Sequence, residues 1–497
     1  MTSFNYTQTL SSILQIESSN NVDQIVYGDD LKIWPVIRIE LYTLLLHNQY
    51  HINDTYPEEL KSHIPQHDIF ENDIKNLLLF AKNNNSNYLF FYRNTKHIDC
   101  IKNNYFNPYI DPVISIEEIK YDSLKIEIKK MDTKNTLPRY FPTFFVSPIF
   151  TGYYRDYNTI KNFQETKNEI FNHFRIDISE SCVIKKIRSI IAGKNFFIKI
   201  LSIIRPKCVF LECYYYDDGF SLVLACKELN IKIIDLQHGY YGKYHAAYTH
   251  WKNIPLNGFN FLPDYFWCWG KKSYDNIKKW YSKPFNHHKP IIGGNLRYVE
   301  WFKSNLKIDK SNETFYNFLK KYKKVILITL QGENAKLPQF FFDAINESPN
   351  NWIWLFRLHP VVNKEQVHKQ LIYDLSQHNI AENKIEIENA TKLPIFELFS
   401  SIHHHVTGWS TVSFDALAFD IPTTFINKTA YDRFDEEIND KIFSFAQSKD
   451  ELLYLINNGS YNNTDHRIFI ETATKKAKVA ISEILFDNQN LPNIYNH

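Results

Sequence analysis

Short apolar runs alternate with helical stretches along most of this chain, and that alternation leaves few folds open to it. In the first half, Val209–Leu211 and Ile231–Leu236 are strand-like, and the helical stretch Phe220–Leu229 lies between them. Two strands joined through a helix form a βαβ unit, in which the strands are parallel. Upstream, Tyr88–Tyr92 suits a buried strand, and Ile33–Leu46 is the most apolar part of a mainly helical beginning. The first half therefore predicts a parallel sheet covered by helices.

The second half repeats the alternation. Its strand-like runs are Lys324–Leu330, Asn351–Leu358, Val406-Thr407 and Pro422–Ile426. The helical stretch Ser410–Phe419 follows the third run, and the polar stretch Lys303–Lys323 precedes the first as a plausible linker. Repeated units of this kind are typical of doubly wound α/β folds. We predict two α/β domains, residues 1–300 with a helical N-terminal part and residues 301–497, which face a central cleft.

Length and charge exclude several other classes of protein. A chain of 497 residues is too long for one ordinary core, which supports more than one domain. The hydrophobic fraction of 44% and the charged fraction of 23% are those of a globular chain rather than a disordered one. Lys and Arg number 57 against 55 Asp and Glu, so the net charge of +2 predicts no nucleic-acid partner.

Cysteines and apolar runs indicate the cellular compartment of the protein. The six cysteines form no CxxC pair, which is typical of reduced thiols rather than of a disulfide framework or a zinc site. The amino terminus lacks the basic start and apolar run of a signal peptide. The best apolar run, Phe196–Ile204, is far shorter than the ~20 residues that cross a bilayer. We expect a cytoplasmic protein, with peripheral contact at the inner face of the membrane as an alternative.

Polar residues follow the predicted strands, at the sheet edge where doubly wound proteins bind ligands. These residues are Glu212, Gln237-His238-Gly239, Gln331-Gly332, His359-Pro360 and Gly408-Trp409-Ser410-Thr411. In the first domain, Glu212 and Gln237 to Gly239 are candidates for lining the cleft or contacting an acceptor. The glycines of Gly293-Gly294 and Gln331-Gly332 would let the backbone approach a nucleotide closely.

Asp217 and Asp218 are adjacent acids that open a glycine turn. Two neighbouring carboxylates repel each other, and a carboxylate in a closed cleft has its pKa raised toward that of a general base. If the pair continues a strand, the two side chains point to opposite faces, and only one of them serves. The alternative is that they form an ordinary turn and cap before a helix.

The second domain offers groups that suit a phosphate. His359-Pro360 ends a strand with Arg357 two residues before it, and the histidine could hold a leaving phosphate or be an ordinary core residue. Ser410 and Thr411 precede a helix, where hydroxyls and free N–H groups bind phosphate or simply cap the helix. Asp415, one turn later, could reach a ribose hydroxyl or remain an exposed acid.

The sequence predicts no metal site. His403–His405 are consecutive and strand-like, so that alternate side chains point to opposite faces and cannot share one ion. The chain contains no Asp-x-Asp, the signature of metal-dependent glycosyltransferases with a single Rossmann domain. It also contains no P-loop, no dinucleotide-binding glycine motif after a strand and no GxSxG.

Three motifs in order resemble those of the bacterial sialyltransferases of the two-Rossmann, GT-B type. They are Tyr216-Asp217-Asp218-Gly219, Arg357-Leu358-His359-Pro360 and Gly408-Trp409-Ser410-Thr411. In that family an acidic-acidic-Gly motif supplies the base, a His-Pro motif meets the CMP, and a Ser-Ser or Ser-Thr motif holds its phosphate. Ser410-Thr411 stands where those enzymes commonly have two serines.

A second resemblance covers Asp235–Gly270. Leu236-Gln237-His238-Gly239, Pro263-Asp264 and Trp267-Cys268-Trp269-Gly270 look like capsule and lipopolysaccharide glycosyltransferases, including those of 3-deoxy-manno-octulosonic acid (Kdo). Similar pieces occur in the CDP-glycerol and CDP-ribitol phosphotransferases of teichoic-acid type. Together the resemblances span about residues 205–430.

These resemblances imply an inverting, metal-independent glycosyltransferase without a cofactor. It would move sialic acid, Kdo or a related ulosonic acid from a CMP donor to an oligosaccharide or lipid-linked glycan. Residues 1–300 would bind the acceptor and residues 301–497 the CMP-sugar. A CDP-polyol phosphotransferase is the alternative.

Overall fold

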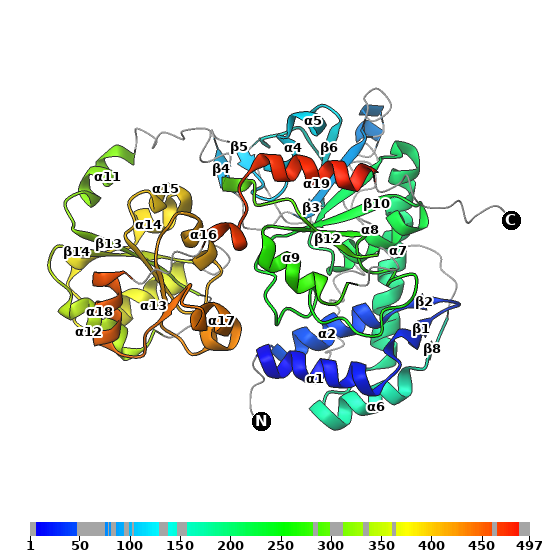
Figure 1. Ribbon diagram of the computed structural model, residues 1–497, viewed down its shortest axis with the longest axis horizontal. Helices are drawn as coiled ribbons and strands as arrows, with labels where there is room; N and C mark the ends of the chain where they lie inside the picture. The colour runs from blue at the N-terminus through cyan, green and yellow to red at the C-terminus, as the bar shows by residue number, and fades with distance from the viewer. Residues whose placement is uncertain are drawn as a thin grey trace. The chain divides into compact units, whose positions relative to one another are not determined.

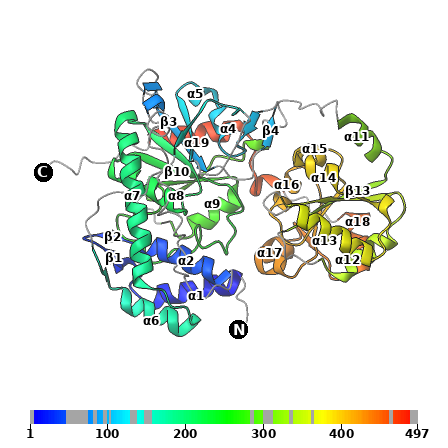
Figure 2. The ribbon, with the colours of Figure 1, turned by 180° about the vertical axis from the view of Figure 1, so that it is seen from behind.

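The computed structural model describes most of the chain. The described residues are 6–46, 75–77, 79–80, 86–93, 99–101, 104–128, 138–146, 157–281, 287–298, 312–331, 337–359, 364–459 and 465–486. The chain divides into two compact units (Figures 1 and 2). Unit 1 consists of Met1–Thr95, Ile101–Leu296 and Ala473–His497, and unit 2 of Lys96–Cys100 and Arg297–Thr472.

Unit 1 is built on a seven-stranded sheet with the order β12-β11-β10-β9-β3-β6-β7. Its strands are β3 (Tyr88–Arg93), β6 (Ser123–Ile128), β7 (Thr143–Val146), β9 (Cys208–Glu212), β10 (Lys232–Leu236), β11 (Tyr265–Cys268) and β12 (Lys289–Ile292). Every neighbouring pair is parallel. β3 and β9 are buried almost throughout, because helices cover both faces of the sheet, and this explains their continuous apolar sequences.

Helices and short strands complete unit 1. The helices are α1 (Tyr6–Ser19), α2 (Trp34–Leu46), α4 (Asp111–Ile114), α5 (Glu117–Lys120), α6 (Phe163–Phe174), α7 (Glu180–Ile204), α8 (Asp217–Glu228), α9 (Lys271–Lys278) and α19 (Thr474–Phe486). One small sheet of unit 1 contains β1 (Val26–Tyr27), β2 (Leu31–Lys32) and β8 (Ile160–Lys161). The short strand β5 (Asn104–Phe106) also belongs to unit 1, whereas Asp99 and Cys100 of β4 (Asp99–Ile101) belong to unit 2. The helix α8 lies between β9 and β10, which confirms the predicted βαβ unit.

Unit 2 contains a six-stranded parallel sheet with the order β15-β14-β13-β16-β17-β18. Its strands are β13 (Lys324–Thr329), β14 (Trp352–Arg357), β15 (Ile385–Glu386), β16 (His404–Thr407), β17 (Thr423–Phe425) and β18 (Ser444–Phe445). Its helices are α11 (Glu313–Leu319), α12 (Gln339–Glu347), α13 (Lys364–Gln377), α14 (Glu388–Lys392), α15 (Ile395–Phe399), α16 (Val412–Ala418), α17 (Thr429–Asn439) and α18 (Lys449–Asn458). The four strands predicted in this half are all present.

Both sheets have the same winding. In chain order, the first three strands of each sheet run outward in one direction, and the fourth strand returns to the other side of the first. This is the 3-2-1-4-5-6 order of doubly wound Rossmann-like domains, and the reversal creates a topological switch point. The switch point lies between β3 and β9 in unit 1, and between β13 and β16 in unit 2.

The C-terminal helix differs from the predicted division of the chain. The sequence interpretation places 301–497 in one domain, whereas α19 belongs to unit 1 and contacts β12. In Figure 1 this red helix lies among blue-to-green elements. Its buried face (Ala477, Ala480, Ile481, Ile484) needs an apolar partner, and β12 supplies one. The part of the predicted linker that the structure describes contains α11, so it is not all irregular chain.

No helix among the described residues has the length and apolarity that crossing a bilayer would require.

Candidate functional site

The switch point of unit 1 brings together groups that sequence order separates. β3 and β9 pair in parallel up to Phe91 and Leu211, so Arg93 and Glu212 lie at the same carboxyl edge of the sheet. In doubly wound folds this crevice is where ligands bind. The sequence analysis identified Glu212 but missed Arg93. A charged residue directly after the predicted strand Tyr88–Tyr92 would have been a reason to include Arg93 among the candidates.

Glu212 is the group at this edge that is best suited to accept a proton. Its side chain is only 8% exposed, and its Oε2 accepts a hydrogen bond of 2.9 Å from Nδ2 of Asn107. Burial raises the pKa of the Glu212 carboxyl to about 7, although the hydrogen bond from Asn107 and the charge of Lys125 act to lower it. A carboxyl with this pKa can take up and release protons at neutral pH.

Asn107 is held firmly in place. Its backbone N–H donates to Oδ2 of Asp111 at 2.8 Å, and its Oδ1 accepts hydrogen bonds of 2.9 Å from the N–H groups of Tyr109 and Ile110. Asp111 in turn forms a fully buried ion pair with Lys125 of β6. The amide that orients Glu212 is thus anchored to a neighbouring strand. Asn107 was also missed in the sequence analysis, because nothing local in its sequence marks it.

Asp217 and Asp218 have partners of their own. They lie in the first turn of α8 and not on a strand, so the expected alternation between opposite faces is wrong. Asp218 is 3% exposed; its Oδ2 lies 2.5 Å from Nε of Arg93, and its Oδ1 accepts from the N–H of Gly219 at 3.0 Å. Asp217 faces the other way and pairs with Lys186 of α7 at 3.1 Å. Only Asp218 therefore lies beside the switch point.

Gly219 explains the tight turn before α8. A Cβ at this position would lie 2.5 Å from the carbonyl oxygen of Tyr214, closer than side-chain carbons approach. The glycine therefore allows Asp218 to reach Arg93. Arg93 also places its guanidinium 4.5 Å from the ring centre of Tyr216, which fixes the orientation of the cation.

His238, Tyr109 and Trp269 form an aromatic wall near Glu212. His238 is half-buried after β10, and its Nε2 lies 3.3 Å from the hydroxyl of Tyr215. Burial lowers the pKa of His238 to about 4, so the imidazole is neutral at pH 7. The rings of Tyr109 and Trp269 stack with centroids 6.1 Å apart, and Tyr109 meets His238 edge-on. Flat aromatic surface beside a proton acceptor suits a sugar-like acceptor.

Gln237 and Gly239 have different roles in the same loop. Gln237 is 2% exposed; it accepts a hydrogen bond of 2.6 Å from the N–H of Trp269 and donates to Ser273 and to the carbonyl of Gly239. Gln237 therefore positions Trp269 rather than offering its own amide to a ligand. Gly239 has open space around its Cα, because a Cβ at this position would meet no other atom within 4 Å.

Gly293 and Gly294 have a packing role in unit 1. A Cβ on Gly293 would fall 1.9 Å from the indole of Trp267, and the Trp267 N–H donates to the carbonyl of Gly294 at 2.9 Å. Gly294 also has a positive φ of 83°. Trp267 therefore requires glycine at position 293, and the positive φ favours glycine at position 294. Their contact with a nucleotide remains a prediction.

A side-chain hydrogen bond joins the two loops at the switch point of unit 2. Oε1 of Gln331, after β13, accepts from the N–H of Trp409, after β16, at 2.7 Å. A small hollow at this edge is lined by Gln331, Gly408, Trp409 and Asn427 together with residues around them. The sequence interpretation located Gln331 and Gly408 at this edge and missed Asn427, which follows β17. Gly332 lies outside the described residues.

Ser410, Thr411 and Asp415 belong to α16 or the turn before it. Ser410 Oγ accepts from the N–H of Val412 at 3.3 Å, and the Ser410 carbonyl accepts from the hydroxyl of Ser413 at 2.9 Å. The N-cap of α16 is Thr411, and it makes no side-chain capping hydrogen bond, so Ser410 precedes the cap and accepts from the first residue of the helix. Asp415 is half-buried and accepts a hydrogen bond from the hydroxyl of Tyr298, so it is not an exposed surface acid.

Arg357 and His359 follow β14. Arg357 donates hydrogen bonds of 2.6 Å to the carbonyls of Ala390 and Leu393, at the end of α14. Partial burial lowers the pKa of His359, so the imidazole is neutral at pH 7 and offers a hydrogen bond rather than a charge. Pro360 lies outside the described residues.

The consecutive histidines are part of the core of unit 2. His404 and His405 are fully buried in β16 and hydrogen-bonded to Thr424, Thr423 and Thr329. Among the residues that the structure describes, no three His, Cys, Asp or Glu side chains gather as metal ligands would.

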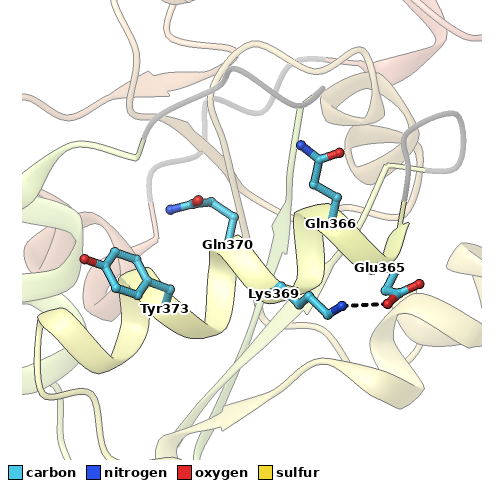
Figure 3. Close-up of a pocket in the computed structure, with 5 residues that line it drawn as sticks. All are labelled: Glu365, Gln366, Lys369, Gln370 and Tyr373. Atoms are coloured by element: carbon cyan, nitrogen blue, oxygen red, sulfur yellow. Dashed lines mark hydrogen bonds and ion pairs between the residues drawn. The ribbon is translucent and has the colours of Figure 1, made fainter.

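A shallow hollow along α13 carries no comparable chemistry. Figure 3 shows its lining residues, which are Glu365, Gln366, Lys369, Gln370 and Tyr373. All of them belong to one helix, and Lys369 donates to Glu365 at 2.6 Å. The lining therefore draws on a single element, and the hollow is an exposed helix surface.

Comparison with known proteins supports the fold. No protein-family profile matches the sequence, and no curated protein is similar to it in sequence. Among solved structures, the UDP-GlcNAc 2-epimerase of Methanocaldococcus jannaschii has a TM-score of 0.50 at 12% identity, over 80% of this chain and 99% of the other. At this identity the similarity concerns the fold alone, and with the sheet orders above it establishes two Rossmann-like units of GT-B type.

Two further solved structures are similar at lower scores. The UDP-GlcNAc 2-epimerase of Neisseria meningitidis bound to UDP-GlcNAc has a TM-score of 0.48 at 15% identity, covering 81% of this chain and all of the other. The wall teichoic acid polymerase TagF, as its H548A variant, has a TM-score of 0.45 at 13% identity, covering 84% and 96%.

Proposed function

We propose that this protein is a glycosyltransferase that takes an activated sugar from a nucleotide donor and attaches it to a glycan acceptor. Glu212 is its general base in unit 1, and the strand ends of unit 2 bind the nucleotide. The donor is a CMP-activated ulosonic acid of the sialic acid or Kdo type. The similarity to an enzyme named for a nucleotide sugar supports the fold of this proposal, and the chemistry is argued from this chain's residues.

One observation carries the proposal. A carboxyl group with a pKa of about 7 lies at the switch point of unit 1, and the loops after the neighbouring strands β10 and β11 carry the rings of His238 and Trp269. Burial disfavours the charged form of the Glu212 carboxyl, and the hydrogen bond from Asn107 orients this carboxyl. Asp218 is less suited as the base because its carboxylate is already paired with the guanidinium of Arg93. Asp217 is turned toward α7.

The reaction follows from these positions. The acceptor oxygen attacks the anomeric carbon of the donor while its proton passes to Glu212. The bond between that carbon and the phosphate oxygen breaks, and its electron pair leaves with the phosphate of CMP. The products are a glycoside with inverted configuration, CMP and protonated Glu212, which loses its proton to solvent before the next turnover.

The groups of unit 2 suit a leaving group with one phosphate. His359, Ser410 and Thr411 would donate hydrogen bonds to it, and Gln331 would help position the nucleotide. His359 is neutral, and the Arg357 guanidinium donates to two carbonyl groups. A donor with a diphosphate would need more positive charge around it. These side chains therefore favour a CMP-sugar donor over the CDP-polyol donor of the alternative function.

A donor screen tests the proposal. Purified protein is incubated with an acceptor glycan and CMP-sialic acid, CMP-Kdo, CDP-glycerol or UDP-N-acetylglucosamine, and the released nucleotide is measured. The proposal predicts release of CMP from one of the two CMP-sugars and loss of that release in Glu212→Gln. Transfer of glycerol phosphate from CDP-glycerol with release of CMP would establish the phosphotransferase instead. Epimerised UDP-sugar, detected in the recovered donor without any transfer, would refute both.

A further inference from the structure

Unit 1 contains a second concave surface at the far edge of its sheet. It runs along the edge strand β12, between α9 and α19, and has a volume of about 600 Å³. Both helices contact β12, and Figure 1 shows them near it. Strands β10 and β11 separate β12 from β9, so at about 4.8 Å per strand spacing β12 is about 14 Å from β9, the strand that carries Glu212.

Three lysines from three different elements line this groove. They are Lys278 of α9, Lys289 of β12 and Lys476 of α19. The lining contains one acid, Glu483, and it pairs with Lys289 at 2.8 Å. The lining therefore keeps a net positive charge, which side chains far apart in sequence create together.

Two tyrosines give the groove flat ring surface. Tyr274 and Tyr281 are half-buried there, and the ammonium group of Lys278 lies 5.3 Å from the ring centre of Tyr274. Tyrosine combines an apolar ring with a hydrogen-bonding hydroxyl. A volume of this size lies within the range of ligand sites.

The floor of the groove excludes one kind of occupant. Pro290 lies in the middle of β12 and has no N–H group, so an added peptide strand could not pair regularly with this edge. Recognition here must therefore depend on the side chains.

We propose that the groove binds an acidic oligosaccharide, whose carboxylates or phosphates meet the lysines and whose sugar rings lie against the tyrosines. A hollow lined by rings favours a chain of sugars over a membrane, because a flat bilayer surface does not enter a hollow. The proposal is independent of the transferase reaction, because binding is measured without turnover.

The test is direct binding of an oligosialic acid, with a neutral maltooligosaccharide, inorganic phosphate and vesicles containing phosphatidylglycerol as comparisons. The oligosialic acid should bind, more weakly as salt increases, and the maltooligosaccharide should not. The double variant Lys278→Gln, Lys476→Gln should lose about tenfold in affinity. The control variant is Lys279→Gln, Lys475→Gln. These two lysines are the sequence neighbours of Lys278 and Lys476 but do not line the groove, so this variant loses the same total charge and should bind like the wild type.

Four results would overturn the proposal. If the groove variant bound oligosialic acid as tightly as the wild type, the groove would not be the binding site. If both double variants lost the same affinity, the binding would be diffuse electrostatic attraction to the surface. Binding to vesicles but not to oligosialic acid would assign the surface to a membrane. If inorganic phosphate bound but oligosialic acid did not, the groove would be an anion site, and the proposed contact of sugar rings with the tyrosines would be wrong.

Discussion

Acid should unfold unit 2 because of two buried histidines. Burial lowers the pKa of His404 and of His405 to about 3, against about 6.5 in an unfolded chain. Below pH 6.5 the unfolded chain binds protons that the folded unit cannot take, so stability falls as the pH falls. Between pH 7 and pH 5 each histidine removes about 2 kcal/mol of stability, and the pair removes about 4 kcal/mol.

Unit 1 should respond less to the same change. Its buried His238 and His288 also have lowered pKa values, of about 4 and about 3, and they destabilise the unit in acid. The pKa values of Glu212 and Asp235 are raised to about 7, so these carboxyls take up protons in the folded state and oppose that loss. The two effects have opposite signs within unit 1, whereas both histidines of the pair in unit 2 act in the same direction.

Hydrogen exchange at pH 7 and pH 5, corrected for the intrinsic rate, separates the units. Amides of β13 and β16 should lose protection by about 4 kcal/mol, while those of β9 and β10 change less. The variant His404→Asn, His405→Asn should be less stable at pH 7 but lose most of this pH dependence. His368→Gln, at an exposed position, should keep it. Equal losses in both units, or an unchanged pH dependence in the double variant, would refute the reasoning.

Three further predictions concern the site and its support. Asp218→Asn should lower activity and loosen Arg93, whereas Asp217→Asn, measured in the same turnover assay, should stay near the wild type because Asp217 pairs away from the switch point. Asn107→Ala removes a hydrogen bond that lowers the pKa of Glu212, so the rise of kcat/KM with pH should move above about 7; an unmoved profile would separate Asn107 from the base. Gly293→Ala should lower the urea midpoint by driving a methyl group into Trp267, whereas Gly239→Ala, which has open space, should not.

The strands could be predicted where burial on both faces makes a sequence continuously apolar. β3, β9, β13 and β14 are of this kind. β6 was missed because its sequence, SLKIEI, reads as half polar. Its Lys125 and Glu127 are nevertheless buried, because Asp111 and Arg139 pair with them. Such pairs depend on tertiary contacts that a local pattern does not contain.

The sequence could predict which chain positions lie at the site, but it could not predict which side chains contact one another there. Residues after strands were located because parallel strands place their carboxyl ends at one edge. The choice among acids depended on partners more than 100 positions away in sequence, namely Arg93 for Asp218 and Asn107 for Glu212. The same holds for α19, whose apolar face could have been read from the sequence but whose partner β12 could not.

The pH dependence of kcat/KM in the wild type and in Glu212→Gln tests the central claim most directly. The glutamine keeps the size of the side chain and its bond to Asn107 but cannot accept the proton. The wild type should gain activity as the pH rises through about 7, because Glu212 must be deprotonated to act. Glu212→Gln should lose about 10²–10⁴-fold in kcat and lose that rise. A variant with near wild-type turnover and an unchanged pH profile would contradict the assignment of Glu212 as the base.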